Sequence, residues 1–335
     1  MSKNIYNRIT VEENNKKYKQ DYRNLISGTI SSVISRTIVA PLDRLKILYQ
    51  VDYIGKNNNT PSIIKGLKLI YQRDGITGYF KGNGINVLKG SPENGIKLYY
   101  FEYIKWNLQY RYGEHLSTSQ LFFAGAVSGV IATCVIFPLE VLKIRIAGSK
   151  PGTYSSIFDA TQKIYKEPKG IFNFYSGIEA GICTVIPNAG LNLTIYEYLK
   201  IFFSGKKTVD NAKHIKGTTL FFIGGLSALL SSTILYPLQI IQARMIMYNL
   251  KRNEFIIDYD NNISNNDINS KKNFRYSKNT KFIKSIIATY KYDGLKGFYK
   301  GYAPGITKIV IGNAIGFYIY EKTKNMLGVN SRKVL

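Results

Sequence analysis

The amino-acid sequence predicts an all-α membrane protein in which six transmembrane helices form three pseudo-symmetric repeats of about 100 residues, with short helices in the connections. The first observation is a proline signature that occurs three times, starting at Pro41, Pro138 and Pro237. The second is a glycine signature that follows each copy and ends at Gly82, Gly177 and Gly301. The third is a set of long stretches suited to cross a bilayer. Self-similarity at a fixed period means that one structural unit is used three times.

Each repeat is expected to contain one span that holds the proline signature and a second span that follows the glycine signature. The odd-numbered spans are expected at 22–48, 121–139 and 217–243, and the even-numbered spans at 83–105, 178–200 and 302–324. Two odd-numbered spans carry no formal charge, whereas the other four spans are typical of helices with one polar face. A mean hydropathy of −0.12 is low for a membrane protein. Six amphipathic spans around a water-filled cavity explain it, because ionisable groups at membrane depth need an aqueous or protein-lined face.

The odd-numbered spans share two local features. Each proline is expected to kink its helix, because proline removes a backbone hydrogen bond. Small residues four positions apart, which let helix backbones approach closely, precede each proline: Gly28 and Ser32, Gly125 and Gly129, Gly224 and Ala228. Short amphipathic helices are expected in the connections at 62–73, 155–165 and 282–290.

The repeats set the expected division of the chain. We expect a polar N-terminal extension at 1–21, repeats at 22–113, 114–206 and 207–328, and a C-terminal tail at 329–335. The third repeat holds an Asn- and Lys-rich segment at 251–280 that the other two lack. Its composition predicts a disordered insertion. The N-terminus has no apolar stretch, so a secretory signal is not expected.

The composition narrows the function classes. A formal net charge of +25 indicates an anionic partner. A nucleic-acid-binding protein would explain the charge but not the long uncharged span. The two cysteines and two histidines have no metal-ligand spacing, so no metal or cofactor is expected. No nucleophile and base occur in a recognisable pattern, which argues against an enzyme. A purely structural membrane protein remains open, but it leaves the charges inside the spans unexplained.

The repeated residues resemble the mitochondrial carrier family over about residues 22–328. The resemblance rests on two motifs, each of which occurs three times in exact or degenerate form. They are P-x-[DE]-x-x-[KR] and [DE]-G-x₄-aromatic-[KR]-G. It implies a six-helix barrel in the mitochondrial inner membrane, with short helices on the matrix side. It also implies a central substrate site that opens alternately to each side, in a protein that works as a monomer. Cardiolipin at the matrix-side helix ends is implied as a lipid partner.

Residues 35–46, 82–89 and 186–190 look most like the transport domain of ATP-Mg/phosphate carriers. Coenzyme A carriers share the Ala-Pro-Leu-Asp-Arg stretch at 40–44 and are the alternative, whereas ADP/ATP carriers resemble the chain at fewer positions. The resemblance therefore implies exchange of a phosphorylated anion. The main prediction is that an adenine nucleotide (ATP, ADP or AMP, with or without magnesium) is exchanged for another nucleotide or phosphate.

The even-numbered spans end in a third repeated motif, an aromatic residue followed by Glu-x-x-Lys. The resemblance implies that these charges form inter-helix salt bridges that close the cytosolic side, and we name them the cytosolic ring. Its members are Glu102, Lys105, Glu197, Lys200, Glu321 and Lys324. The alternative is a set of ordinary pairs between residues i and i+3 of one helix.

The resemblance implies a second set, the matrix ring, in the proline signatures. Its members are Asp43, Lys46, Glu140, Lys143, Gln239 and Gln242, with Gln50 at the family's brace position. In the family's geometry each acid pairs with the base of the next odd-numbered helix. Asp43 and Lys143 then form an ion pair. Because Gln239 and Gln242 carry no charge, the other two ring contacts are expected to be hydrogen bonds, between Glu140 and Gln242 and between Gln239 and Lys46.

An asymmetric ligand can bind a triplicated scaffold only where the repeats differ. Equivalent positions hold Lys89, Thr184 and Lys308 in the even-numbered spans, and Arg36, Thr133 and Ser232 in the odd-numbered ones. Three cations thus stand midway along their spans without carboxylates at the equivalent positions. We predict that they bind the anion, with structural pairing as the alternative. In the resemblance to ADP/ATP carriers, Arg36, Lys89 and Lys308 fall on that family's phosphate-binding cations.

Thr184 and Val185 occupy the family's second contact point. ATP-Mg/phosphate carriers usually have Gly-Ile there. A glycine at this position leaves room for a flat ring, whereas threonine narrows that space. These two residues are therefore predicted to influence the choice of nucleotide base.

Overall fold

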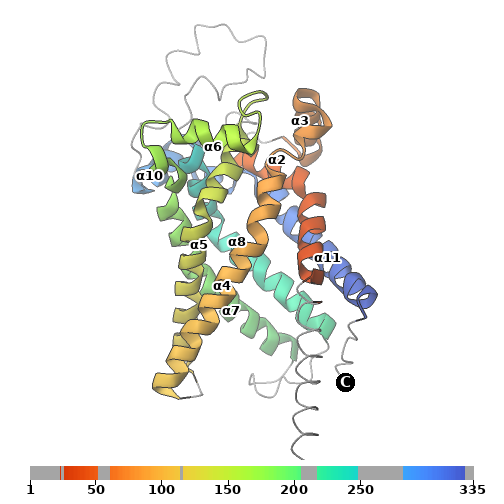
Figure 1. Ribbon diagram of the computed structural model, residues 1–335, viewed down its shortest axis with the longest axis vertical. Helices are drawn as coiled ribbons and strands as arrows, with labels where there is room; N and C mark the ends of the chain where they lie inside the picture. Colours follow the sequence, from red (N-terminus) through yellow and green to blue (C-terminus); the bar gives the residue numbers. More distant parts are fainter. Residues whose placement is uncertain are drawn as a thin grey trace, which may run out of the picture.

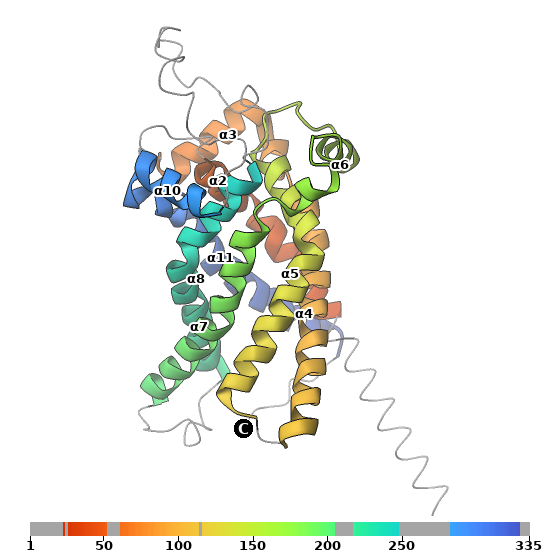
Figure 2. The same ribbon diagram turned by 90° about the vertical axis from the view of Figure 1, so that its left-hand side faces the viewer.

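The computed structural model describes residues 23, 26–51, 61–113, 116–204, 217–247 and 282–328. The described part is built of helices and contains no strand. The predicted segments 1–21, 251–280 and 329–335 lie outside the described residues. Figures 1 and 2 show long helices side by side, with the short helices gathered at one end of the bundle.

All six predicted long helices are present. The first occupies 26–38 and continues through a turn at Val39 into α2 (Ala40–Gln50). The others are α4 (Asn83–Tyr112), α5 (Thr118–Gly148), α7 (Ile178–Ser204), α8 (Gly217–Met247) and α11 (Tyr302–Met326). α4, α7 and α11 continue past the Glu-x-x-Lys motif, and α5 and α8 also run beyond their predicted ends.

The long helices form a closed ring in chain order. α4 packs on α5, α5 on α7, α7 on α8, and α8 and α2 on α11. Hydrogen bonds from Arg36 and Asn83 join the first helix to α4. Every helix therefore has a neighbour on each side around the ring, which is the arrangement of a barrel around a central axis, and α2, α5 and α8 also contact one another.

The short helices lie together at one end (Figure 2). They are α3 (Ile63–Gly78), α6 (Ile157–Tyr165) and α10 (Phe282–Asp293), with 3₁₀ turns η1 (Gly170–Tyr175) and η4 (Leu295–Tyr299). The amphipathic patterns at 62–73, 155–165 and 282–290 predicted these three helices. The Ser156 side chain caps α6 by accepting from the amide of Asp159 at 3.1 Å.

The second glycine signature determines where the even-numbered helices begin. Gly82, Gly177 and Gly301 directly precede α4, α7 and α11, with φ angles of 85°, 83° and 78°. A side chain is strained at such angles. A Cβ at Gly301 would lie 2.9 Å from the Lys46 carbonyl oxygen. These positions therefore need glycine both for the turn and for close contact with an odd-numbered helix.

The apolar core seals the end that carries the short helices. One cluster joins α2, α5 and α8 through Ile47, Phe137, Val141, Ile144 and Ile246. At the opposite end, aromatic side chains of α4 such as Trp106 and Tyr110 are 62% and 84% exposed. The bundle is thus packed shut at the short-helix end, whereas these aromatic side chains at the far end of α4 lie on its surface.

Hydropathy separates the long helices into two groups. Three segments of the described chain are long and apolar enough to cross a membrane: Thr118–Gly148, Gly170–Phe203 and Phe222–Met247. The other long helices carry more charge, as Lys89, Glu93 and Lys97 show in α4. This division matches the prediction for α5 and α8, whereas α7, one of the four spans predicted to have a polar face, is also apolar enough to cross a membrane.

Candidate transport site and gates

The matrix ring is engaged in this structure. Lys143 Nζ lies 2.9 Å from Asp43 Oδ2, and each side chain is only 9% exposed. Lys46 Nζ donates to Gln239 Oε1 at 3.0 Å. The first contact joins α2 to α5 and the second joins α2 to α8. Odd-numbered helices of all three repeats are therefore held together at the end that the apolar core seals.

The predicted contact between Glu140 and Gln242 is wrong. Glu140 Oε2 instead lies 2.6 Å from Lys89 Nζ on α4, whereas Gln242 lies beside Gly181 of α7. A lysine within reach is a stronger partner for a carboxylate than a neutral amide. The matrix ring is therefore extended by a cation from an even-numbered helix.

Both mid-span lysines have carboxylate partners in this conformation, which is the structural pairing that the sequence left open as the alternative. Lys89 contacts Glu93 at 3.2 Å in addition to Glu140. Lys308 pairs with Asp43, which thus holds Lys143 and Lys308 at once. Comparison of equivalent positions could not find these pairs, because the acids belong to the proline signatures and not to the positions compared.

Arg36 differs from the two lysines. Its Nε donates to Ser32 Oγ at 3.1 Å, and its Nη1 donates to the backbone and side-chain oxygens of Asn86 at 3.2 Å each. No carboxylate contacts it within the described residues. Arg36 therefore remains a cation whose positive charge is not neutralised by a neighbouring acid in this conformation.

Charges are unbalanced where these residues meet. Five cations come together at the matrix ring and directly beside it: Arg36, Lys46, Lys89, Lys143 and Lys308. The acids in contact with them are Asp43, Glu93 and Glu140. The excess of positive charge favours an anion at this level of the bundle.

Thr184 and Val185 lie on α7 between the matrix ring and the cytosolic ring. The Thr184 hydroxyl donates to the Ala180 carbonyl of its own helix at 2.8 Å. Val185 packs against α5, since its Cγ1 would lie 2.7 Å from a Cβ at Gly129. Val185 is thus at a helix interface, and the hydroxyl of Thr184 is already occupied as a donor.

The cytosolic ring is disengaged. Glu102 and Lys105 are 3.6 Å apart within α4, and Glu197 and Lys200 are 3.7 Å apart within α7. Lys324 lies over the ring of Tyr320 in its own helix. None of the ring residues, all of which are described, contacts a ring residue of another helix. The structure is thus closed at the matrix ring and open at the cytosolic ring.

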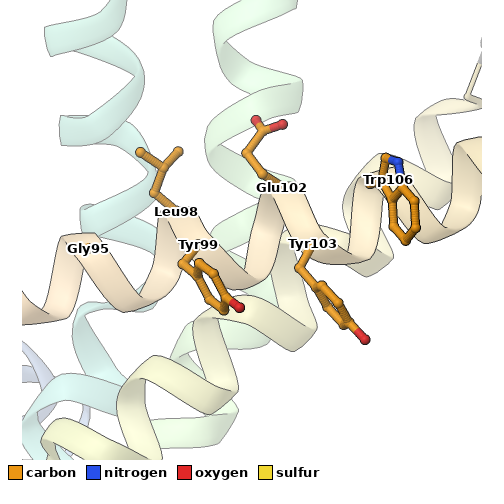
Figure 3. A pocket seen from close by; sticks show the side chains of 6 residues that line it. All are labelled: Gly95, Leu98, Tyr99, Glu102, Tyr103 and Trp106. Atoms are coloured by element: carbon orange, nitrogen blue, oxygen red, sulfur yellow. The ribbon is translucent and has the colours of Figure 1, made fainter. Parts of the chain in front are cut away.

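An open hollow of about 400 Å³ lies beside the cytosolic ring (Figure 3). It is lined by residues of α4 alone: Gly95, Leu98, Tyr99, Glu102, Tyr103 and Trp106. Tyrosine and tryptophan near a helix end are typical of the membrane–water interface. The hollow therefore carries aromatic side chains of this kind, reaches the cytosolic ring at Glu102, and contains none of the predicted substrate-binding residues.

Sequence reasoning missed three buried arginines that join the repeats in a cycle. Arg44 Nε donates to the Ala147 carbonyl at 3.2 Å, Arg145 Nε to the Ile246 carbonyl at 3.3 Å, and Arg244 Nε to the Gln50 carbonyl at 3.0 Å. Each also pairs with an acid near a glycine signature: Asp74, Glu167 and Asp293. Gln50, the predicted brace, is buried beside Arg244. Comparison of the repeats did not reveal these arginines, because they do not occupy equivalent positions. Arg44 lies three residues after its proline, whereas Arg145 and Arg244 each lie seven residues after theirs.

Two ionisable groups in the short-helix layer have shifted pKa values. Burial, reinforced by the Arg44 charge, lowers the pKa of Lys81 to about 8. Its Nζ donates to the carbonyls of Ser149 and Lys150. Burial opposes ionisation of Asp74, but hydrogen bonds and charges from Arg73 and Arg44 lower its pKa overall. Lys81 thus connects the first repeat to the second, whereas Asp74 holds α3 to Arg44 within the first repeat.

Comparison with known proteins agrees with this geometry. The family model described as mitochondrial carrier protein matches residues 18–112, 114–207 and 213–331. A mitochondrial adenyl nucleotide antiporter of Xenopus laevis is 33% identical over 95% of this chain and 61% of its own length. The Homo sapiens antiporter is 30% identical over 96% of this chain and 61% of its own length. Mitochondrial substrate carrier family protein A of Dictyostelium discoideum is 34% identical over 88% of this chain and 82% of its own length.

The chain spans about three-fifths of the length of the two antiporters. The match nevertheless covers all three repeats, and the closed ring of six helices contains the residues on which the resemblance rested. Family membership makes it a multi-pass protein of the mitochondrial inner membrane. The chain belongs to the mitochondrial carrier family.

Proposed function

We propose that this carrier exchanges an adenine nucleotide for another nucleotide or phosphate by alternating access. The observation that carries the proposal is the group formed by Arg36, Lys89 and Lys308. These cations come from three helices and lie next to a closed gate, with positive charge in excess. The relatives named as adenyl nucleotide antiporters support the same substrate class.

The contacts suggest how binding is coupled to opening. Lys89 and Lys308 hold Glu140 and Asp43, two acids of the matrix ring. A phosphate group that binds these lysines competes with the acids for the same N–H donors. Loss of the lysine contacts weakens the matrix ring, and closure of the cytosolic ring then completes the change of access. The substrate can drive this step only through its stronger binding to the changing contacts.

Coenzyme A or a related adenosine phosphate is the alternative substrate. It offers phosphates to the same cations, and Thr184 narrows the space for the base beside them. We propose no enzymatic or nucleic-acid-binding role. A single chain closes the helix ring, which supports a monomer. We also propose cardiolipin at the amino ends of α4, α7 and α11, where backbone N–H groups favour an anionic headgroup.

Counter-exchange in proteoliposomes tests the function. Liposomes loaded with ADP are offered ATP, ADP, AMP, phosphate or coenzyme A, and uptake of each is followed. We expect nucleotide uptake that depends on internal nucleotide. Uptake of none of these anions by correctly inserted protein would refute the proposal.

The site is tested by removing charges in matched pairs. Lys89→Gln with Glu140→Gln removes the cation without leaving its buried acid unpaired. Lys163→Gln with Asp159→Gln is the control, because this ion pair lies on the surface of α6. We expect the first pair to weaken apparent affinity at least tenfold, since a charge-assisted hydrogen bond contributes about 1.5–3 kcal/mol, and the control pair to leave it unchanged. Equal affinity in both would remove Lys89 from the site.

A further inference from the structure

The guanidinium of Arg36 lies directly on the backbone of α4 at Gly90. A Cβ built at Gly90 would be 2.7 Å from Arg36 Cζ, 2.8 Å from Nε and 2.9 Å from Nη2. Non-bonded carbons are at optimal separation at about 3.5–4.0 Å. The group in conflict is the far end of a flexible side chain, so an added methyl would displace the guanidinium and leave the helix in place.

Hydrogen bonds fix the guanidinium in this position. Nε donates to Ser32 on its own helix, and Nη1 donates twice to Asn86, one turn before Gly90. Nη2 has no acceptor within the described residues. The arginine is therefore held along two edges and retains a donor for a ligand.

The glycine is specific to the repeat that carries the arginine. The positions equivalent to Gly90 are Val185 and Ile309, and those equivalent to Arg36 are Thr133 and Ser232. In the second repeat the arrangement is reversed, because Val185 on α7 packs against Gly129 on α5. In the first two repeats, the helix that faces the larger side chain thus carries glycine.

We propose that Gly90 is a positioning residue that holds Arg36 ready as the first phosphate contact in the matrix-closed conformation. The inference rests on the proposed exchange of a phosphorylated anion. Lys89 and Lys308 are engaged by acids of the matrix ring, whereas Arg36 is not. A phosphate thus meets Arg36 without displacing a carboxylate. A side chain at position 90 would move that donor set away from Ser32 and Asn86.

The test is a double-mutant cycle of Gly90→Ala and Arg36→Ala, read as KM and kcat of counter-exchange. Gly84→Ala is the matched control on α4, because a Cβ at Gly84 meets nothing within 4 Å. We expect Gly90→Ala to raise KM about tenfold through loss of aligned charge-assisted hydrogen bonds, with kcat largely kept. We expect Gly84→Ala to leave KM unchanged. In the Arg36→Ala background, Gly90→Ala should have no further effect on KM.

Thermal unfolding in detergent separates positioning from damage to the fold. Alanine is a better helix former than glycine, so Tm of Gly90→Ala should be no lower than that of Gly84→Ala. An unchanged KM in Gly90→Ala, or an equal rise in KM in the presence and absence of Arg36, would overturn the inference.

Wild-type exchange in the same experiment decides the proposed function independently. The cycle is measured with whichever of ATP, ADP, AMP, phosphate or coenzyme A the wild type exchanges. If the wild type exchanges only coenzyme A, the substrate is coenzyme A and not a nucleotide. The double-mutant cycle measured with coenzyme A then decides the role of Gly90. A wild type that exchanges none of them overturns both proposals.

Discussion

Replacing Gln239 by glutamate should hold the matrix ring shut more tightly. Gln239 Oε1 already accepts from Lys46 Nζ at 3.0 Å, and glutamate has the same length and shape. Two unit charges at this separation attract by about 5 kcal/mol at an effective dielectric constant of about 20. Burying the new carboxylate costs several kcal/mol. We expect a net gain of about 1 kcal/mol, because the surrounding lysines outnumber the acids, and this corresponds to about a fivefold shift towards the matrix-closed state.

Turnover and thermal stability report this shift together. The stabilised closed state should lower kcat of counter-exchange about fivefold, because the ring opens less often in each cycle. Affinity for external substrate should not fall. Tm in detergent should rise by about 2 °C, the effect of about 1 kcal/mol on a protein of this size.

Gln242→Glu is the matched control for Gln239→Glu. It makes the same chemical change one turn further along α8, beside Gly181, where the described chain supplies no lysine contact. It should not raise Tm. The reasoning fails if Gln239→Glu leaves both Tm and kcat unchanged, or if both variants change them equally.

Three further predictions concern segments outside the site. Deleting about 24 residues from 251–280 should leave exchange intact, since lengthening a surface loop costs little; loss of exchange by a correctly inserted deletion would contradict this. Asp74→Asn should lower Tm at neutral pH. The pKa of Asp74 is lowered in the folded chain, so its ionised form stabilises the fold at pH values above its ordinary pKa of 3.8, and this stabilisation is lost as the pH falls through the lowered pKa. A Tm difference that persists unchanged at acid pH would argue against this. The pKa of Lys81 is lowered from 10.5 to about 8 in the folded chain, so between pH 8 and 10.5 the unfolded chain binds more protons than the folded one. The contribution of Lys81 to the free energy of unfolding therefore rises with pH in this range. Lys81→Met should flatten the dependence of Tm on pH between pH 8 and 10, and the same dependence in both proteins would refute this prediction.

The parts of the fold that the sequence predicted best were those with a local physical cause. The helices at Asn83, Ile178 and Tyr302 begin where predicted, because a glycine with positive φ must precede each of them. The contacts of Asp43 with Lys143 and of Lys46 with Gln239 were expected from the resemblance to the carrier family, and both are present.

The parts that the sequence did not predict depend on side-chain reach between different motifs. Nothing in the separation of Lys89 from Glu140, or of Lys308 from Asp43, indicates that these residues meet. The importance of Gly90 becomes visible only when Arg36 is seen lying on it. The substrate-binding roles of these residues remain predictions.

The arginine cycle on the matrix side makes the three repeats mechanically interdependent. Arg44, Arg145 and Arg244 each hold the short-helix layer of their own repeat and the carboxyl end of the odd-numbered helix in the next repeat. The positive charge also suits a helix carboxyl end. One repeat cannot tilt away from a neighbour without pulling on a carbonyl held by another arginine. The three repeats are therefore expected to move together when the matrix side opens. An opening that moves a single repeat is disfavoured, because it breaks hydrogen bonds to both neighbouring repeats.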